Sequence, residues 1–239
     1  MKLEALSLTK YFGEKCALDH VSIEVEESEI VGLLGPNGSG KTTTFYSILG
    51  LIEPDKGKIS IDSSDISNLP IYKRVRRGIG YLPQEPSIFE SLTTRENLTI
   101  ILEFIEKDRV LREKEVFSLL SFLGLSSLSH QKAGTLSGGE RRRLEIARVL
   151  SLHPKFILLD EPFLGVDPIR VSEIQEIIKN LKNKGFGILI TDHNVRETLK
   201  ITDRAYIIFE GKILLEGSSS DLVNNKEVRR VYLGDSFEF

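Results

Sequence analysis

Features of secreted and membrane-spanning proteins are missing from this sequence. Its 239 residues include a single cysteine, Cys16, which cannot form an internal disulfide and agrees with a reducing compartment. Apolar runs reach only about four residues, whereas a membrane-spanning helix needs about 20. The N-terminus carries charge at Lys2 and Glu4 and no small-residue cleavage site comes after it, so we expect no signal peptide. These absences predict a cytoplasmic protein.

The sequence also lacks an excess of positive charge. Lysine and arginine number 32 against 35 acidic residues, a net charge of −3, which gives no overall attraction to nucleic acid. Two short basic clusters, residues 73–77 and 141–143, have no interleaved aromatic residues. We expect them to be solvent-exposed helix faces, with contact to anionic headgroups near a membrane surface as the alternative. No nucleic-acid partner is expected.

No repeat or linker divides the chain, and strand and helix patterns alternate along it. Val21, Ile23 and Val25 alternate with polar residues, as in a half-exposed antiparallel strand, and residues 30–34 are continuously apolar, as in a strand buried on both faces. The next pattern is one helix face at the spacing i, i+3, i+4, i+7, formed by Phe45, Ile48, Leu49 and Ile52. A strand, a loop and a helix therefore begin the core.

The middle of the chain, from about residue 93 to 150, contains helical stripes and no convincing strand. Thr93 and Glu96 form a capping-box signature at the start of the first helix. Two stripes come next at helical spacing, namely Leu98, Ile101, Leu102 and Ile105, then Val116, Leu119, Leu120 and Leu123. Strands are expected again at residues 156–159, 187–190 and 204–209, with a helix between the first two that carries Ile174, Ile177, Ile178 and Leu181. The pattern predicts an α/β fold: a mostly parallel sheet flanked by helices, with a helical insertion.

A glycine-rich loop comes directly after the first buried strand. Residues 35–42 fit the pattern G-x-x-x-x-G-K-[ST]. The glycines let backbone N–H groups turn toward one anion, and the next helix adds its positive N-terminus. Lys41 would reach the outer phosphates, and Thr42 would offer a hydroxyl to Mg²⁺. The alternative is a plain glycine-rich turn, but a chance match in this context is rare, so the loop predicts phosphate binding.

Two adjacent acids end a second buried strand. Residues 156–159 lead directly into Asp160 and Glu161, at the strand end where ligands of open parallel sheets bind. Asp160 suits the shell of Mg²⁺, and Glu161 suits a base that orients or deprotonates a water attacking a γ-phosphate. The alternative is that Asp160 merely caps the next segment of the chain.

A second capping box lies at Ser137 and Glu140 and opens a helix. Capping alone does not explain Gly138 and Gly139, because two glycines in a first helical turn cost stability unless the backbone there must approach something closely. A second anion-binding helix N-terminus is the sharper hypothesis.

Together these motifs, in this order, make the chain resemble the nucleotide-binding subunits of ABC transporters. The resemblance covers nearly the whole length and implies a P-loop NTPase of ABC type, with an N-terminal antiparallel β part and an inserted helical subdomain. The implied division is a nucleotide-binding α/β core at about residues 1–84 and 151–239, and a helical subdomain at about residues 85–150 that includes the signature.

The resemblance also implies roles for single residues. Gln84 would be the Q-loop glutamine and His193 the H-loop histidine, which with Glu161 make up the catalytic set. The Mg²⁺ ion would be held by Thr42, Gln84 and Asp160. The ATP-binding residues would be Phe12, Gly35, Pro36, Asn37, Gly38, Ser39, Gly40, Lys41, Thr42, Thr43, Ser137, Gly138, Gly139 and Asp167.

Several of these residues carry little information when read alone. Asp167, with proline as its next residue, is also an ordinary helix start. A lone histidine such as His193 is more often structural, and Gln84 by itself is a loop residue. The family places an aromatic residue under the adenine ring, where Phe12 matches best and Tyr11 is its rival.

The family also implies partners. Two subunits face head to tail, so Ser137 and Gly139 of one chain would hold the γ-phosphate on the loop of the other, in an ATP-bound homodimer or a heterodimer with a related subunit. Transmembrane permease subunits would insert a short cytoplasmic helix after the Q-loop, where the apolar candidates are Ile88, Phe89 and Leu92. Ordinary packing of the subdomain hinge is the alternative for these three. The protein would then be peripheral on the cytoplasmic face of the inner membrane.

A finer resemblance is to the lipopolysaccharide-export ATPase subunits, on residues 77–85, 160–163, 190–199 and 230–235. Leu164 departs from the small residue expected before Gly165. Two alternatives stay open: the ATPase subunit of a branched-chain amino acid importer, and a soluble ABC ATPase that acts on ribosomes or DNA. The second usually carries two cassettes or a long coiled-coil insertion, and no sustained heptads are present here. A nucleotide-binding switch without turnover would be expected to lack Glu161 or His193.

Overall fold

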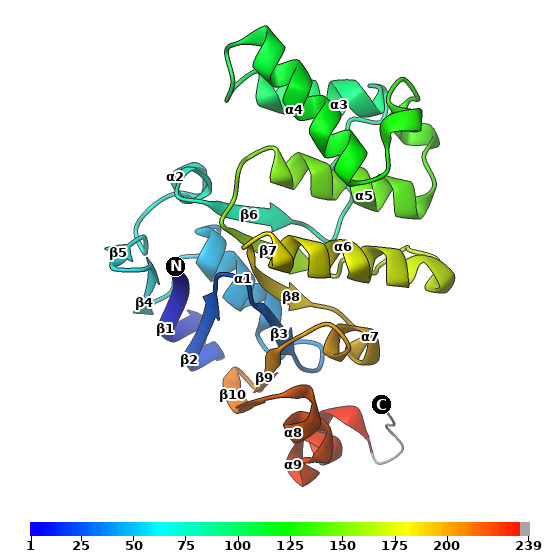
Figure 1. Cartoon of the computed structure of the whole chain (residues 1–239). Coiled ribbons are helices and arrows are strands. Elements are labelled where there is room, and N and C mark those ends of the chain that lie inside the picture. Colours follow the sequence, from blue (N-terminus) through cyan, green and yellow to red (C-terminus); the bar gives the residue numbers. More distant parts are fainter. Residues whose placement is uncertain (235–239) are drawn as a thin grey trace.

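A six-stranded sheet forms the centre of the computed structural model, which describes residues 1–234 (Figure 1). The strand order is β10-β9-β3-β8-β7-β6, and only the β9–β10 pair among these described strands is antiparallel. The strands are β3 (Ile30–Leu34), β6 (Ile79–Leu82), β7 (Phe156–Asp160), β8 (Gly187–Thr191), β9 (Arg204–Phe209) and β10 (Lys212–Gly217). The predicted mostly parallel core is therefore confirmed.

A four-stranded antiparallel sheet lies beside it, in the order β2-β1-β4-β5. Its strands are β1 (Lys2–Phe12), β2 (Lys15–Glu26), β4 (Lys56–Ile61) and β5 (Ser64–Asp65). Val21, Ile23 and Val25 are buried on one side of β2, whereas Ser22 and Glu26 are exposed. The strand predicted from this alternation is confirmed.

Helix α1 (Lys41–Leu49) packs between the two sheets. Phe45 and Leu49 join Leu33 of β3 and residues of β1 and β2 in one apolar cluster. Gly50 ends the helix in a left-handed conformation with φ of 76°. Ile52, which the periodicity assigned to the same helix face, therefore lies beyond the helix end. The packing fixes the loop before α1 at the carboxyl end of β3.

Helices α5 (Gly138–Leu150) and α6 (Val171–Asn183) cover the other face of the parallel sheet. Alternate residues of β7 serve the two faces, because Phe156 and Leu158 belong to the cluster around α1 while Ile157 and Leu159 pack with α5 and α6. A strand buried on both sides explains the continuous apolar run.

The predicted helical region is confirmed, with α3 (Thr94–Leu102) and α4 (Arg109–Phe122) lying above α5 in Figure 1. The capping box at Thr93 forms, and Leu98, Leu102, Val116 and Leu120 are buried. Ile105 departs from its predicted stripe, because α3 has ended and this side chain is 41% exposed.

The remaining α-helices of residues 1–234 are short. They are α2 (Ile71–Arg76), α7 (Val195–Leu199), α8 (Ser219–Asn224) and α9 (Lys226–Val228), with a π-helical turn η4 (Arg229–Leu233). Asp235, the last residue of the stretches that carry the finer resemblance, lies outside the described residues. Within residues 1–234, every helix is too short or too polar to cross a bilayer.

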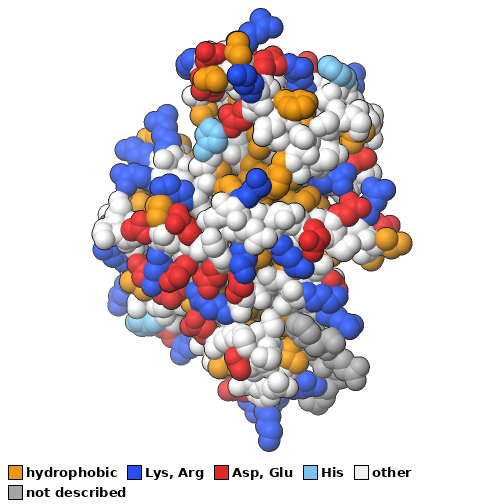
Figure 2. Space-filling view, in the orientation of Figure 1, with side chains coloured by type: hydrophobic (Ala, Val, Ile, Leu, Met, Phe, Trp, Pro, Cys, Tyr) orange, Lys and Arg blue, Asp and Glu red, His pale blue; other side chains and the backbone are white. Residues whose placement is uncertain are grey.

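The two basic clusters are not uniformly exposed. Figure 2 shows acidic and basic side chains intermingled over the face that it presents. Arg74 and Arg142, however, are only 2% and 5% exposed, so the expectation of solvated faces is wrong for these two residues. Arg74 donates hydrogen bonds of 2.7 Å to the carbonyl oxygens of Ser47 and Ile48, which compensate its buried charge at the end of α1.

Candidate nucleotide site

The glycine-rich loop connects β3 to α1 through two positions where only glycine fits. A Cβ atom at Gly35 would lie 2.1 Å from the carbonyl oxygen of Ile208. At Gly40, with φ of 115°, it would lie 2.9 Å from the carbonyl oxygen of Ala17. Gly40 is the N-cap of α1 and makes no side-chain capping bond, so the first N–H groups of the helix stay available to an anion.

Two side chains of this loop, those of Lys41 and Ser39, are suited to bind such an anion. The Nζ atom of Lys41 donates hydrogen bonds to the carbonyl oxygens of Gly35 at 2.6 Å and Pro36 at 2.9 Å. Burial lowers the pKa of this ammonium, and the nearby carboxylates of Glu161 and Asp160 oppose that effect. The hydroxyl of Ser39 is buried and has no hydrogen-bond partner in the described structure. An unpaired buried hydroxyl beside a cation and free amides fits a phosphate ligand.

Asp160 and Glu161 have different surroundings. Asp160 is 5% exposed and accepts a hydrogen bond of 3.2 Å from the hydroxyl of Tyr81, and burial raises the pKa of its carboxyl. Glu161 has φ of 48°, a left-handed conformation that is uncommon for a residue with a side chain and recurs at functional sites. The chain turns sharply there, directly after β7.

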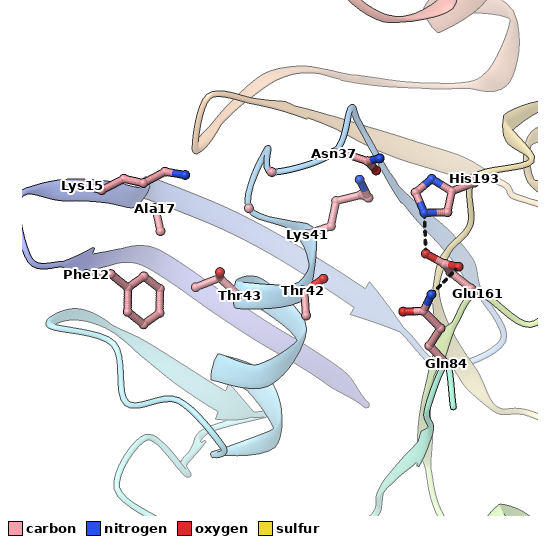
Figure 3. A pocket seen from close by; sticks show the side chains of 12 residues that line it. Phe12, Lys15, Ala17, Asn37, Lys41, Thr42, Thr43, Gln84, Glu161 and His193 are labelled. Carbon is pink, nitrogen blue, oxygen red and sulfur yellow. Dashed lines mark hydrogen bonds and ion pairs between the residues drawn. The ribbon is translucent and has the colours of Figure 1, made fainter. Parts of the chain in front are cut away.

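Glu161, Gln84 and His193 meet at one edge of the sheet (Figure 3). The Nε2 atom of Gln84 donates a hydrogen bond of 3.0 Å to Oε2 of Glu161, and Nε2 of His193 lies 2.7 Å from Oε1. The three residues come after β6, β7 and β8, which are neighbours in the sheet. Burial raises the pKa of the Glu161 carboxyl, and the charge that His193 carries when protonated opposes the shift.

A pocket of about 410 Å³ joins these side chains to the β1–β2 hairpin. In Figure 3, Phe12 lies at the end opposite to Glu161 and His193, with α1 and its loop between them. Tyr11, the rival of Phe12, does not line this pocket. The lining residues are Phe12, Lys15, Ala17, Asn37, Gly38, Gly40, Lys41, Thr42, Thr43, Gln84, Glu161 and His193.

Lys15 and Ala17 are pocket residues that sequence reasoning missed. Lys15 lies directly across the hairpin from Phe12. A predicted hairpin at Gly13 would have been the signal, since it pairs the residue before the turn with the one after it.

The structure does not bring the signature and Asp167 to this pocket. Ser137 caps α5, accepting a hydrogen bond from the backbone of Glu140 and donating one of 2.7 Å to its carboxylate. Asp167 caps a short 3₁₀ helix, η3 (Pro168–Arg170), by accepting a bond from the N–H of Ile169. A Cβ at Gly138 would lie 2.5 Å from the carbonyl oxygen of Gly165, so the close approach inferred for the two glycines exists at Gly138, where the neighbour belongs to the same chain. A Cβ at Gly139 would make only an ordinary contact of 3.6 Å with Arg170.

Arg142 connects the helical region to the catalytic edge, a second relationship that sequence reasoning missed. Its guanidinium is buried in α5 and forms an ion pair of 2.8 Å with Glu145. It also donates hydrogen bonds of 2.9 to 3.1 Å to four backbone carbonyl oxygens, those of Pro83, Asp160, Glu161 and Pro162. The segment before Gln84 and both acids are thereby tied to one side chain.

The three apolar residues after Gln84 are not equivalent. Ile88 is partly buried against the core, as the hinge-packing alternative expects. Phe89 is 45% exposed, and the guanidinium of Arg148 lies 4.7 Å from the centre of its ring. Two hydrogen bonds between Asn97 and the backbone of Phe89 hold this segment in place. Leu92 is partly buried.

Comparison with known proteins places these features in a family. Residues 18–164 match the family model described as "ABC transporter". A lipopolysaccharide export system ATP-binding protein LptB of Acidithiobacillus ferridurans is 52% identical over 99% of this chain and 98% of its own length. The protein of the same name from Haemophilus influenzae is 53% identical over the same shares.

Solved structures agree with the sequence relatives. An ATP-binding cassette of an ABC transporter in its ADP conformation superimposes with a TM-score of 0.88, at 34% identity over 98% of this chain and 100% of the other. A second cassette, a dimer in a post-hydrolysis state bound to ADP and phosphate, gives a TM-score of 0.79 at 27% identity, over 91% of this chain and 98% of the other.

Proposed function

This chain belongs to the ABC transporter family, and from that premise we propose that it is the ATP-hydrolysing subunit of a lipopolysaccharide export system. The observation that supports ATP hydrolysis is that Gln84, Glu161 and His193 converge on the pocket beside the phosphate loop. The choice of lipopolysaccharide as the substrate rests on relatives that are about half identical over nearly the whole chain.

ATP would lie along the pocket from the hairpin to the sheet edge. Its adenine ring would stack on Phe12, and its phosphates would lie against the N–H groups before α1. Lys41 would exchange its loop carbonyl partners for the outer phosphate oxygens, and the unpaired Ser39 hydroxyl would gain a partner. This exchange replaces bonds from the ammonium to neutral carbonyls by bonds to negatively charged phosphate oxygens, which are stronger.

Mg²⁺ fits the donors near the phosphate end. Thr42 and Gln84 line the pocket, and among residues 1–234 the carboxylate of Asp160 accepts one side-chain hydrogen bond, of 3.2 Å, from the hydroxyl of Tyr81. Hydroxyl, amide and carboxylate oxygens are the ligands that this hard cation prefers, so Thr42, Gln84 and Asp160 would hold it. When bound, the ion would neutralise charge on the β- and γ-phosphates.

Glu161 would act as the base for hydrolysis. A water between its carboxylate and the γ-phosphate would attack phosphorus, its proton would pass to Glu161, and ADP would leave with the electrons of the broken P–O bond. Gln84 and His193 hold the two carboxylate oxygens in the resting chain, so they fix the direction from which that water is bound. The raised pKa of Glu161 favours accepting the proton.

A second copy would complete the site. Ser137 and Gly139 lie away from the pocket of their own chain, so an anion bound at the N-terminus of α5 would come from a facing subunit. The dimer would then hold two ATP molecules, each between the phosphate loop of one chain and the signature of the other, with Asp167 at the contact between them.

Transport would require a separate transmembrane partner, because the described chain has no membrane-spanning helix. We place the partner's contact at residues 88–92 on the cytoplasmic face of the inner membrane. Phe89 is the strongest candidate, since its ring is exposed while its backbone is fixed by Asn97. Motion of the Gln84 segment would thereby reach the membrane subunits.

Depletion in the native host tests the proposal. Loss of this protein should cause lipopolysaccharide to accumulate in the inner-membrane fraction, and wild-type chain should reverse this while Glu161→Gln should not. Untagged membrane subunits should copurify with both forms. Normal lipopolysaccharide distribution in depleted cells, with an amino acid uptake defect instead, would contradict the substrate but leave the ATPase assignment standing.

A further inference from the structure

Arg170 lies over the signature loop. Its Nη1 atom donates a hydrogen bond of 3.4 Å to the hydroxyl of Ser137, and its Cδ atom lies 3.6 Å from where a Cβ would stand on Gly139. The residue ends η3, three positions after Asp167, and is the N-cap of α6. Two segments far apart in sequence therefore present one guanidinium, one hydroxyl and the N-terminus of α5 at a single place.

Among residues 1–234, Arg170 is not ion-paired, but the carboxylate of Glu140 partly compensates its charge. No carboxylate of residues 1–234 lies within ion-pair distance of this guanidinium, although Glu140 is near enough to feel its field. The one hydrogen bond that the guanidinium makes to the described part of the chain is long, and the side chain is exposed. Neighbouring Arg143, by contrast, pairs with Glu173 at 2.6 Å.

Two helix dipoles oppose a cation at this position, whereas the carboxylate of Glu140 favours it. The N-terminus of a helix carries partial positive charge, so an arginine at the N-cap of α6 and beside the start of α5 is repelled by both helix dipoles. The arrangement becomes favourable once an anion arrives between them. A triphosphate end with several negative charges is such an anion.

We propose that Arg170 supplies a positive charge to the γ-phosphate of the ATP bound by a second copy of this chain. The inference rests on the composite site proposed above. The guanidinium is hydrogen-bonded to the Ser137 hydroxyl. A phosphate oxygen bound to the same hydroxyl therefore lies close to Arg170, and a modest rotation of the arginine brings the two into direct contact. Arg170 therefore strengthens ATP-dependent closure of the dimer and contributes nothing to ATP binding by one chain.

The test uses Glu161→Gln as the parent, because slow hydrolysis preserves ATP in the dimer. Sedimentation equilibrium with Mg-ATP gives its dissociation constant in low and high salt, and dilute protein with a fluorescent ATP analogue gives the affinity of the monomer. Adding Arg170→Gln should weaken the dimer about tenfold or more in low salt, because each of the two composite sites loses one charge at the interface. The loss should shrink near 1 M salt, where the screening length is about 3 Å.

Two further variants separate charge from structure. Arg170→Lys should restore much of the dimer affinity because it keeps the charge. Lys179→Gln removes another exposed cation of α6, about 13 Å further along the helix, and should leave the dimer unchanged. Because the helix dipoles oppose the charge of Arg170 and the carboxylate of Glu140 favours it, Arg170→Gln should unfold at a temperature close to that of its parent.

The outcomes are distinct. If the parent dimerises with ATP and Arg170→Gln dimerises equally well, the inference about Arg170 is overturned and the composite site stands. The same holds if Arg170→Gln weakens the dimer by the same factor at every salt concentration. If the parent itself forms no ATP-dependent dimer, the composite site fails and takes the inference with it. A loss of monomer ATP affinity in Arg170→Gln would also refute the assignment.

Discussion

His193 and Glu161 are partners in the resting chain, with Nε2 of the imidazole 2.7 Å from Oε1 of the carboxylate. Gln84 holds the other oxygen at 3.0 Å. The carboxylate that is best placed to accept a proton is thus oriented from both sides by residues of its own chain. Orientation of this kind lowers the cost of assembling the site at the moment of reaction.

Glu161→Gln should separate ATP binding from hydrolysis. The amide keeps the shape of the side chain but cannot act as a base, and loss of a positioned base typically costs about 10² to 10⁴ in rate. Removing one acid beside a triphosphate should leave ATP binding intact or improved. Size-exclusion chromatography with light scattering should show a monomer without nucleotide and a doubled mass with Mg-ATP.

Asp160→Asn is the matched control for this variant. Loss of the carboxylate proposed to hold Mg²⁺ should weaken productive binding of Mg-ATP and give no trapped dimer. Hydrolysis by Glu161→Gln within a few fold of wild type would exclude Glu161 as the base.

The pH dependence of hydrolysis should reflect the surroundings of Glu161. A base must be ionised, and burial raises the pKa of this carboxyl, so the rate should fall on the acid side at a pH above that of an ordinary glutamate. The charge of His193 lowers the same pKa. His193→Gln should therefore move the acid limb to higher pH, in addition to slowing the reaction.

Single-turnover rates measured from acid to neutral pH, each normalised to its own plateau, check this. An acid limb that stays in place or moves to lower pH in His193→Gln would show that the two side chains are not electrostatically coupled during turnover.

The parts of the fold that the sequence predicted well are those buried on both sides. Residues 30–34 and 156–159 are continuous apolar runs because α1 covers one face of their sheet, while the other face is covered by α5 and α6 at residues 156–159 and also by α7 and α8 at Leu34. Strand β6 was missed because its four residues include Gly80, which packs against Val149 and Pro154 and gives no alternation. Strand β4 was missed because it begins with exposed Lys56 and Gly57.

The residues of the candidate site also fall into those that the sequence predicts and those that it does not. The phosphate loop, Asp160 and Glu161 are readable from local chemistry, because each combines a strand end with groups that suit phosphate or metal. Arg142 was read as part of a solvated basic run, since sequence cannot reveal that its guanidinium meets four backbone carbonyls. Only the three-dimensional fold brings the segments at residues 83 and 160–162 together.

Ser137→Arg should leave ATP binding to the monomer nearly intact and block dimer closure and hydrolysis. The new side chain lies where the phosphate held by the facing chain must arrive. Loss of the helix cap should also reduce stability by about 1 kcal/mol, and Ser137→Ala shares that loss without the bulk. Light scattering and an ATPase assay on both variants distinguish the effects; normal turnover of the arginine variant would mean that α5 does not face the nucleotide.

Arg142→Met should destabilise the protein strongly. It leaves Glu145, which is 3% exposed, as a buried charge without its partner, and breaking such a pair costs about 3 to 5 kcal/mol. Four carbonyl oxygens around Gln84 and Glu161 also lose their donor, so residual ATPase activity should fall even where the variant is folded. Urea unfolding measures the first effect and ATP turnover in the folded range measures the second.

The double variant Arg142→Met with Glu145→Leu separates the ion pair from the carbonyl contacts. The double variant has no buried carboxylate without a partner. It should therefore be more stable than Arg142→Met alone, although it also lacks the polar side chain of Glu145. Activity should not recover with stability, because the carbonyls of Asp160 and Glu161 still lack their donor. Arg143→Met is the control, since its pair with Glu173 is partly exposed and should contribute about 1 kcal/mol or less. If the double variant regained both stability and turnover, Arg142 would serve the core alone and the positions of Gln84 and Glu161 would not depend on it.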